Sequence, residues 1–243
     1  MVVQGRTTRW TLPHAWDLPV EEARAAQTLL AGQVIARATF SPADLQTVAG
    51  VDVGFQGNRA RAAGVVLGFP QLNLVEWALS ETPASFPYVP GLLAFREAPA
   101  VLKALELLRV WPDLFIFDAH GLAHPRRLGL AAQLGVILDC PSIGCAKSRL
   151  CGRSAEPGEA AGDWAPLQVG EETIGAVLRT ATRKKPVYGS IGHRVDLLTA
   201  VDLVRACTRG HRLPETTRHA HRLAGGTEAM APPPDHAGVL ERG

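Results

Sequence analysis

The residues with the clearest chemical meaning lie between Asp113 and Gly129, in the sequence DLFIFDAHGLAHPRRLG. The apolar run at 114–117 predicts a strand that is buried on both faces, and this run ends on the carboxylate of Asp118. Ligands of open α/β sheets bind beyond the carboxyl ends of such strands. Burial of a carboxylate there costs free energy unless a metal, another cation or solvent contacts it. The loop that follows offers two His and two Arg around a glycine, namely His120, Gly121, His124, Arg126 and Arg127. This combination predicts a metal ion that handles a phosphate.

Two further carboxylates lie in separate parts of the sequence. Asp52 lies inside TVAGVDVGF, a predicted strand, where it is either a ligand or a structural hydrogen-bonding residue. Glu97 closes PYVPGLLAFRE and precedes a predicted helix, where a negative charge by itself favours the helix dipole. If Asp52, Glu97 and Asp118 converge, they could hold Mg²⁺, which prefers oxygen ligands. Such a cation would polarise a phosphodiester and help to generate hydroxide from water.

Lys147 and His193 are candidates for the remaining chemistry. Lys147, in CAKSRL, follows a predicted short strand and could reach a scissile phosphate or position the attacking water. The alternative is a surface lysine. His193, in GSIGHRVD, ends a β-like run before a helix and could stand beside the metal or carry a proton. A capping or packing role would explain His193 as well.

The segment FPYVPG presents Tyr88 between two prolines, Pro87 and Pro90, which stiffen the backbone around it. A stiff loop that presents an aromatic ring suits insertion into a base stack or replacement of a displaced base. The alternative is an aromatic ring that packs over the edge of the core. Because this loop leads directly to Glu97, we favour the wedge.

Hydrophobic periodicity and turn residues predict the elements that position these residues. Helices are expected over 20–37, 99–110, 127–134 and 195–208, and strands over 47–55, 62–69, 72–80, 114–118, 141–145, 173–180 and 187–191. The first three strands are joined by links short enough for hairpins, so they should be antiparallel neighbours. The order of elements predicts an α/β fold, with a mixed central sheet and helices on both faces.

The composition and the positions of proline and glycine predict one main domain. We expect an N-terminal arm over 1–18, a single domain over 19–215 and a disordered tail over 216–243. The three consecutive prolines and scattered glycines indicate that disorder begins at about His219. No apolar run approaches the ~18 residues of a membrane span, and the start is not a secretory signal. Four irregularly spaced cysteines predict reduced thiols in a cytoplasmic protein.

Charge is unevenly distributed although the net charge is only +2. Residues 179–222 contain ten Lys or Arg but only three Asp or Glu. A polyanion could bind to this surplus of positive charge. A solvated surface with a basic tail is the alternative.

Five segments together resemble the endonuclease V family of deoxyinosine-specific endonucleases, which has a ribonuclease H-like fold. They are VAGVDVGF, FPYVPGLLAFRE, DAHGLAHPRRLGLA, IGCAKSRLCG and YGSIGHRV, which occur in the family's order and span roughly residues 19–208. The resemblance implies hydrolysis of the second phosphodiester on the 3′ side of deoxyinosine, leaving 3′-hydroxyl and 5′-phosphate ends. It also implies Mg²⁺ as cofactor, with Mn²⁺ as a substitute, and DNA or RNA that contains inosine as partner. We expect a monomer.

The resemblance also implies roles for individual residues. Asp52, Glu97 and Asp118 match the metal carboxylates, with His193 near the same site, and Lys147 matches the catalytic lysine. Tyr88 matches the wedge, and His124 and the arginines after it match a loop that approaches nucleic acid. The segment that contains Pro90, Gly91 and Leu93 matches the wall of the base pocket. The backbone near Ala119, His120 and Gly121 borders the same pocket.

Four positions depart from the family pattern. Gly54 and Phe55 stand where Ser or Ala and then Tyr are usual, so a phenolic hydrogen bond is absent. Ala119 replaces a glycine after the second aspartate, and its methyl group could narrow the base pocket or exclude a positive φ. Gln133 stands where His is frequent. Nuclease chemistry is therefore better supported than hypoxanthine selectivity.

Three alternatives follow from these residues. The first is a protein of this fold that binds inosine-containing nucleic acid without cutting it, although every expected carboxylate and the lysine are present. The second is a nuclease of this fold with altered base specificity. The third is an enzyme that acts on a small phosphorylated molecule, for which the Tyr88 loop would have no purpose.

Overall fold

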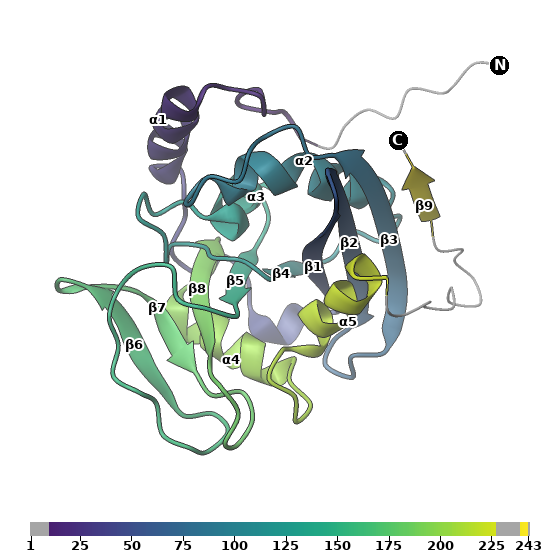
Figure 1. Cartoon of the computed structure of the whole chain (residues 1–243). Coiled ribbons are helices and arrows are strands. Elements are labelled where there is room, and N and C mark those ends of the chain that lie inside the picture. Colours follow the sequence, from purple (N-terminus) through teal and green to yellow (C-terminus); the bar gives the residue numbers. More distant parts are fainter. Residues whose placement is uncertain (1–9, 227–238, 243) are drawn as a thin grey trace.

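The computed structural model describes residues 10–226 and 239–242, which fold around one nine-stranded sheet (Figure 1). The strand order is β6-β7-β8-β5-β4-β1-β2-β3-β9. The strands are β1 (Thr47–Gln56), β2 (Arg59–Gly68), β3 (Leu74–Pro83), β4 (Leu114–Phe117), β5 (Ser142–Ala146), β6 (Trp164–Val169), β7 (Glu172–Leu178), β8 (Val187–His193) and β9 (Val239–Arg242). The helices are α1 (Val20–Ala31), the 3-10 turn Pro42–Asp44, α2 (Leu93–Glu106), α3 (Leu130–Leu138), α4 (Leu197–Ala206) and α5 (Glu215–Ala224).

The centre of the sheet is mixed, as the sequence predicts. β1, β2 and β3 are antiparallel neighbours, which confirms the two predicted hairpins. β4 pairs in parallel with both β1 and β5, so these three strands end at the same edge of the sheet. Val51 is in register with Phe117, and this register brings the next residue of each strand, Asp52 and Asp118, side by side.

Helices cover both faces of the sheet, which confirms the predicted α/β class. The side chains of β4 alternate between the faces, as a pleated strand requires. Phe115 and Phe117 pack with residues of α2 and α3 on one face. Leu114 and Ile116 pack with residues of α4 and α5 on the other. Because β4 is buried on both sides, its four apolar residues form the centre of the core.

Three helices differ from the prediction by three or more residues at one or both ends. α1 ends at Ala31, six residues before the predicted end, because Gly32 caps it. α2 begins at Leu93, so Glu97 lies within the helix rather than before it. Pro99 suggested a helix start, since proline suits a first turn, but the buried apolar face of α2 maintains the helix around it. α3 begins at Leu130 instead of 127, where Arg127 has a positive φ of 55°.

The prediction of disorder from His219 is wrong for the residues that form α5. This helix buries Ala220, Leu223 and Ala224 against the sheet. Its first turn approaches β1 so closely that a Cβ on Gly50 would lie 2.0 Å from the Thr216 carbonyl oxygen. The predicted boundary at residue 215 therefore coincides with the start of a packed helix, and residues 227–238 and 243 lie outside the described residues.

The described part of the N-terminal arm contains no helix or strand before Val20, and residues 1–9 lie outside the described residues. Aromatic contacts hold the arm against the domain. Trp10 stacks on Trp111 with ring centroids 6.0 Å apart, and His14 stacks on Phe95 of α2 at 4.9 Å. Within the described residues, no helix is both long and apolar enough to cross a membrane.

We predict that Gly50→Ala lowers the free energy of unfolding by about 1–3 kcal/mol, because the new methyl group would overlap the backbone of α5. Chemical denaturation measures this loss, and limited proteolysis within α5 should accelerate. Gly189→Ala is the control, since a Cβ there would meet its nearest atom, the Ala176 carbonyl oxygen, at 3.9 Å. Equal stability of the two variants would show that α5 does not need this close approach.

Candidate active site

Three neighbouring strands place predicted site residues at one edge of the sheet. Asp52 lies in β1, Asp118 directly follows β4 and Lys147 directly follows β5. The Asp118 N–H donates to the Val51 carbonyl at 3.0 Å, which continues the β1–β4 pairing up to the carboxylate. α2 brings Glu97 from one face of the sheet, and α5 brings His221 from the other. Figure 1 shows α5 lying beside β1 and β2.

A continuous set of polar contacts joins four of these side chains. His221 Nδ1 lies 2.6 Å from Asp52 Oδ2 and 3.2 Å from Lys147 Nζ, and Lys147 forms an ion pair with Asp118. A single Nδ1 atom carries either a proton or a lone pair. It can therefore donate to Asp52 or accept from Lys147, but not both at once. The four side chains therefore cannot all satisfy one another's hydrogen bonds at the same time.

Burial and mutual repulsion disfavour charge on the carboxylates. Burial, followed by the charges of Asp52 and Asp118, raises the pKa of Glu97 to about 8. Burial and the charge of Asp52 raise the pKa of Asp118 to about 6, against the opposing effect of Lys147. At neutral pH without a cation, Glu97 is therefore mostly protonated.

The donor set fits a divalent cation. Asp52, Asp118 and His221 each offer a ligand atom, and these atoms lie within 4.8 Å of one another. Carboxylate oxygens are the ligands that Mg²⁺ and Ca²⁺ select, and imidazole nitrogen extends the choice to transition metals. Glu97 provides a further carboxylate beside the cluster. A cation there would favour its charged form against the burial and the neighbouring charges that raise its pKa.

The structure places His193 away from this cluster, so the prediction that it stands beside the metal is wrong. His193 pairs with Ser142, at the opposite end of β5 from Lys147. Five residues of strand separate those two ends by about 16 Å. His193 Nδ1 accepts from the Ile35 N–H at 3.2 Å, and its Nε2 lies 3.5 Å from Asp139 Oδ1. Its role is structural, and burial lowers its pKa.

His221 is the site residue that the sequence analysis missed. A helix signal was present around it: Pro214 and Glu215 at the start, basic residues in the last turn and Gly225 as the cap. The proline- and glycine-rich residues that follow obscured this signal. The sheet topology, rather than the local sequence, brings His221 to Asp52.

A pocket of about 190 Å³ is lined by His120, two residues after Asp118, and by Ser148, the neighbour of Lys147. It is smaller than the roughly 300–1,000 Å³ of pockets for drug-sized ligands, and a single base is a smaller occupant. Six predicted nucleic-acid-binding residues line it together with others from α1 and the 148–150 loop. The six are Tyr88, Pro90, Gly91, Leu93, His120 and His124. Tyr88 is 71% exposed, as a wedge residue must be.

Burial keeps the two pocket histidines neutral. It lowers the pKa of His120 to about 4, and it acts with the charge of Arg126 to lower the pKa of His124 to about 4. A neutral imidazole has one donor and one acceptor. In His124 both are used, by the Gly91 carbonyl and the Arg126 N–H, whereas Nδ1 of His120 has no hydrogen-bond partner within the described residues.

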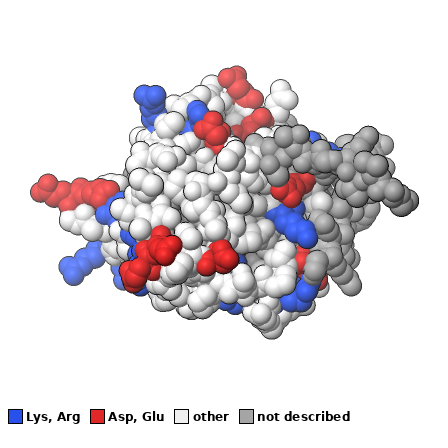
Figure 2. Space-filling model, turned by 90° about the horizontal axis from the view of Figure 1, so that it is seen from above, with Lys and Arg blue, Asp and Glu red and all other residues white. Residues whose placement is uncertain are grey.

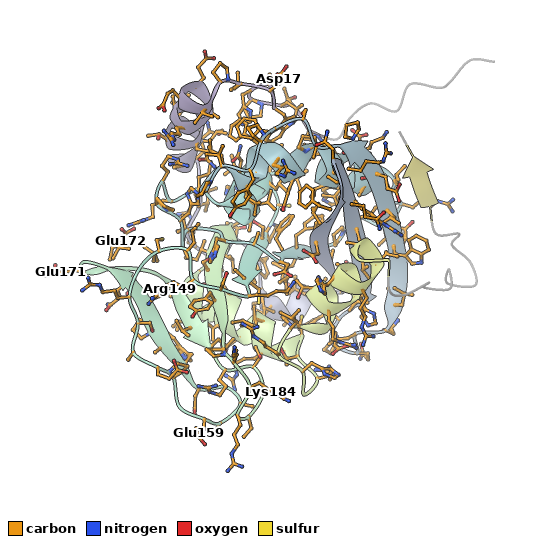
Figure 3. The ribbon with its side chains drawn as sticks, in the orientation of Figure 1. Asp17, Arg149, Glu159, Glu171, Glu172 and Lys184 are labelled. Atoms are coloured by element: carbon orange, nitrogen blue, oxygen red, sulfur yellow. The ribbon has the colours of Figure 1, made fainter. Side chains whose placement is uncertain are left out.

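The other predicted nucleic-acid contacts are used within the protein. Arg126 donates to Gln27 and to the Gly91 carbonyl. Arg127 forms a bidentate pair with Glu172, which Figure 3 labels at the β6–β7 turn. Gly121 allows a close backbone approach, since a Cβ there would lie 1.9 Å from the Ile191 carbonyl oxygen. These residues shape the loop rather than extend from it.

The departures from the family pattern have local explanations. Ala119 is buried in the hydrophobic core, does not line the pocket and has no positive φ, so its methyl group does not narrow the pocket. Gly54 faces the end of α5, with a Cβ position 3.0 Å from the Ala224 carbonyl oxygen. The Arg96 guanidinium lies over the Phe55 ring at 4.6 Å. Gln133 bonds to His14 of the arm and to Gln27 of α1.

Half of the ten Lys and Arg of residues 179–222 form ion pairs with carboxylates. Arg179, Arg183, Arg194, Arg205 and Arg218 each form an ion pair with an Asp or Glu. Figure 2 shows basic and acidic side chains scattered around a largely uncharged centre on the face seen from above. That face lies over α1 and α2, whereas residues 179–222 form β8, α4 and α5 in the lower part of Figure 1.

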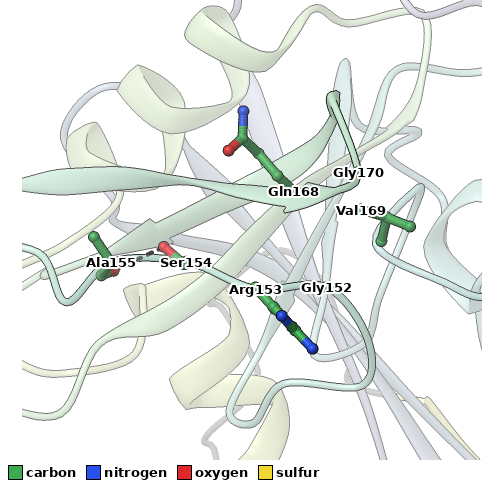
Figure 4. Close-up of a pocket in the computed structure, with 7 residues that line it drawn as sticks. All are labelled: Gly152, Arg153, Ser154, Ala155, Gln168, Val169 and Gly170. Atoms are coloured by element: carbon green, nitrogen blue, oxygen red, sulfur yellow. Dashed lines mark hydrogen bonds between the residues drawn. The ribbon is translucent and has the colours of Figure 1, made fainter.

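Another pocket lies at the β6 edge of the sheet (Figure 4). Residues 152–155 and 168–170 line it, and Arg153 pairs with Gln168 there. It contains none of the predicted site residues and no carboxylate. Within the described residues, the group of three side chains that could hold a metal ion lies instead at the edge formed by β1, β4 and β5.

Comparison with known proteins identifies relatives that share the sequence and the fold. A family model described as endonuclease V matches residues 28–222. Endonuclease V of Roseiflexus castenholzii is 53% identical over 211 residues, which cover 87% of this chain and 94% of the relative. The crystal structure of endonuclease V from Streptomyces avermitilis is 44% identical with a TM-score of 0.83, covering 89% of this chain and 96% of that one. The Ciona intestinalis endonuclease V, in complex with a 24mer DNA that contains an inosine followed by a ribo-adenosine, is 28% identical with a TM-score of 0.77, covering 86% and 96%. These structural relatives confirm the predicted ribonuclease H-like class.

The raised pKa of Glu97 predicts a pH-dependent effect of Glu97→Gln in metal-free buffer. The pKa of this carboxyl rises from 4.5 to about 8 on folding, so the parent loses stability as pH increases from 4.5 through 8. The amide does not titrate. Between pH 5 and pH 8, the free energy of unfolding of the variant should therefore rise by at least ~1 kcal/mol relative to that of the parent. Urea denaturation at the two pH values measures this difference. Adding Mg²⁺ should shrink that gain, because a cation favours the charged form of Glu97.

The exposed carboxylate of Glu171 supplies the control. The difference in free energy of unfolding between Glu171→Gln and the parent should be the same at pH 5 and pH 8. A stability difference for Glu97→Gln that is constant from pH 5 to pH 8 would contradict the pKa assignment.

Proposed function

The chain belongs to the endonuclease V family, and we propose from this membership that it is a repair endonuclease that cuts DNA at deoxyinosine. It hydrolyses the second phosphodiester on the 3′ side of the lesion and leaves 3′-hydroxyl and 5′-phosphate ends. One observation carries this proposal: the Asp52, Asp118, Lys147 and His221 cluster lies beside a base-sized pocket with an exposed aromatic ring. RNA that contains inosine is a second substrate to test.

We propose that Mg²⁺ is the cofactor, with Mn²⁺ as a substitute. Asp52, Asp118 and Glu97 would hold the cation, with His221 beside it. When bound, such a cation polarises a phosphodiester and makes water a stronger acid. In this proposal, Glu97 and Asp118 must give up the protons that their raised pKa values favour, so cation binding is coupled to proton release.

Lys147 supplies the mobile positive charge. Its Nζ is paired with Asp118 and lies 3.2 Å from His221, and about a third of its side chain is exposed. This exposure would let the ammonium group turn from Asp118 towards an incoming phosphate. There it stabilises the negative charge that develops during hydrolysis. His221 orients Asp52 through its 2.6 Å contact and, at Nδ1, can exchange a proton with the site.

The Tyr88 loop and the adjacent pocket account for base recognition. A base inside a duplex must leave the stack to enter a pocket, and unstacking costs a few kcal/mol. Tyr88, fixed by its neighbouring prolines and directed to solvent, can fill the gap that the base leaves. The neutral imidazoles of His120 and His124 line the pocket that receives the base.

The wider organisation is also proposed. The endonuclease domain spans residues 19–224, because α5 supplies His221 and extends the domain beyond residue 215. The four cysteines are unpaired, and three of them are buried, which supports a reducing compartment such as the cytoplasm. We propose that the protein acts as a monomer.

We predict that Asp118→Asn lowers the cleavage rate of an inosine duplex by more than ~100-fold in Mg²⁺, because a ligand of the cation loses its charge. Binding of the same duplex should persist, since the pocket and Tyr88 are unchanged. Gel-based cleavage and fluorescence anisotropy measure the two properties. Glu171→Gln, an exposed carboxylate at the β6–β7 turn, should cut like the parent (Figure 3). Undiminished cleavage by Asp118→Asn would remove the metal assignment, and a parent that binds but never cuts would be a binding protein.

We predict that Tyr88→Ala weakens binding of an inosine duplex by about 1–3 kcal/mol, the usual value of one base–aromatic stack. Tyr88→Phe keeps the ring and should bind like the parent. The Mg²⁺ concentration for half-maximal cleavage should not change in either variant. If Tyr88→Ala bound inosine duplex with the affinity of the parent, the wedge role would be excluded.

A further inference from the structure

Gln27 of α1 is a fully buried polar side chain that touches the pocket and that no catalytic role explains. Both ends of its amide are occupied. Its Oε1 accepts from Arg126 Nε at 2.8 Å, and its Nε2 donates to the Leu128 carbonyl at 3.2 Å and to Gln133 Oε1 at 3.3 Å. Reversing the amide would set its NH₂ group against the Arg126 N–H. The orientation of Gln27 is therefore fixed by its partners.

Gln27 orients the guanidinium group of Arg126 towards the inside of the protein. The Arg126 Nη2 group donates to the Gly91 carbonyl at 2.6 Å, while its Nε is held by Gln27. A guanidinium is planar and rigid, so a bond at Nε sets the direction of Nη2. Without Gln27, this side chain would lose the contact that turns it from solvent towards the pocket wall.

The Gly91 carbonyl receives a second donor from His124, whose Nε2 lies 3.0 Å away. A carbonyl only accepts, so Nε2 carries the proton and the unprotonated Nδ1 accepts from the Arg126 N–H at 3.2 Å. Gly91 has a φ of 80°, and a Cβ there would lie 3.0 Å from Arg126 Nη2. The Arg126 guanidinium thus lies against the bare backbone of the residue that forms the pocket wall.

We propose that Gln27 is a positioning residue for base selection: through Arg126 it holds the Gly91 peptide and so sets the width of the base pocket. This inference depends on the proposed function. A fixed wall excludes guanine, which differs from hypoxanthine by an additional exocyclic amino group. A wall that can move admits that group, so loss of Gln27 should reduce discrimination more than it reduces catalysis.

The test is Gln27→Leu, which preserves size but removes both hydrogen-bonding ends. Cleavage is measured in Mg²⁺ on matched duplexes that carry either deoxyinosine or deoxyguanosine at one position. The ratio of kcat/KM for the two duplexes should fall at least ~10-fold, with most of the change in KM. Arg126→Lys retains the charge but lacks the guanidinium fork, and it should reproduce the same fall.

Two variants separate positioning from general structural support. Gln133→Leu removes another buried partner of Gln27 but leaves the bond from Arg126 to Gln27, so it should keep the parent's ratio even if it lowers the melting temperature. Gln27→Glu keeps the acceptor for Arg126 and should restore the ratio relative to Gln27→Leu. If Gln27→Leu does not fold, the comparison of Arg126→Lys with Gln133→Leu decides the question.

The outcomes distinguish this inference from the proposed function. A parent that does not cut inosine duplex would overturn the proposed function itself. A parent that cuts, together with an unchanged ratio in folded Gln27→Leu or Arg126→Lys, would overturn the role of Gln27. An equal fall in Gln133→Leu would also overturn it, because the effect would then come from packing in general.

Discussion

The repulsion among Asp52, Glu97 and Asp118 is the constraint on which the site depends. Folding brings these carboxylates together at one edge of a buried sheet, and burial raises the pKa of Glu97 to about 8. Lys147 and His221 offset part of this repulsion, but one imidazole nitrogen cannot satisfy both of its neighbours. The arrangement is tolerated because the core on both sides of β4 fixes the strands. A site held under such repulsion is suited to gain stability from a cation.

The base pocket depends on a different kind of interaction. It is shaped by hydrogen bonds among uncharged groups and one guanidinium, which connect α1 through Gln27 to Gly91. A buried polar network of this kind fixes geometry when each member has a partner. In our proposal the protein separates two tasks: the repelling carboxylates at the strand ends serve hydrolysis, and the hydrogen-bonded network from Gln27 to Gly91 serves selection of the base.

Much of the fold could be predicted because it depends on local patterns. The apolar run of β4, the hairpins of β1–β3 and the carboxylate at the end of β4 are visible in the sequence and confirmed by the structure. The prediction was wrong where packing overrides local signals. Pro99 lies inside α2 because the apolar face of that helix is buried, and α5 forms after residue 215 because Gly50 admits its backbone.

The sequence by itself marked Asp118 and the stiff loop around Tyr88 through their own neighbours. For Asp52 and Lys147 the neighbours left a structural alternative open, and the resemblance to a family made the choice. Only the tertiary structure decided which histidine joins them. His193 and His221 both stand beside polar residues in the sequence, but the antiparallel direction of β8 carries His193 to the far edge, and the packing of α5 brings His221 to Asp52. That choice depends on strand direction and on contacts between distant segments, which a local sequence pattern does not contain.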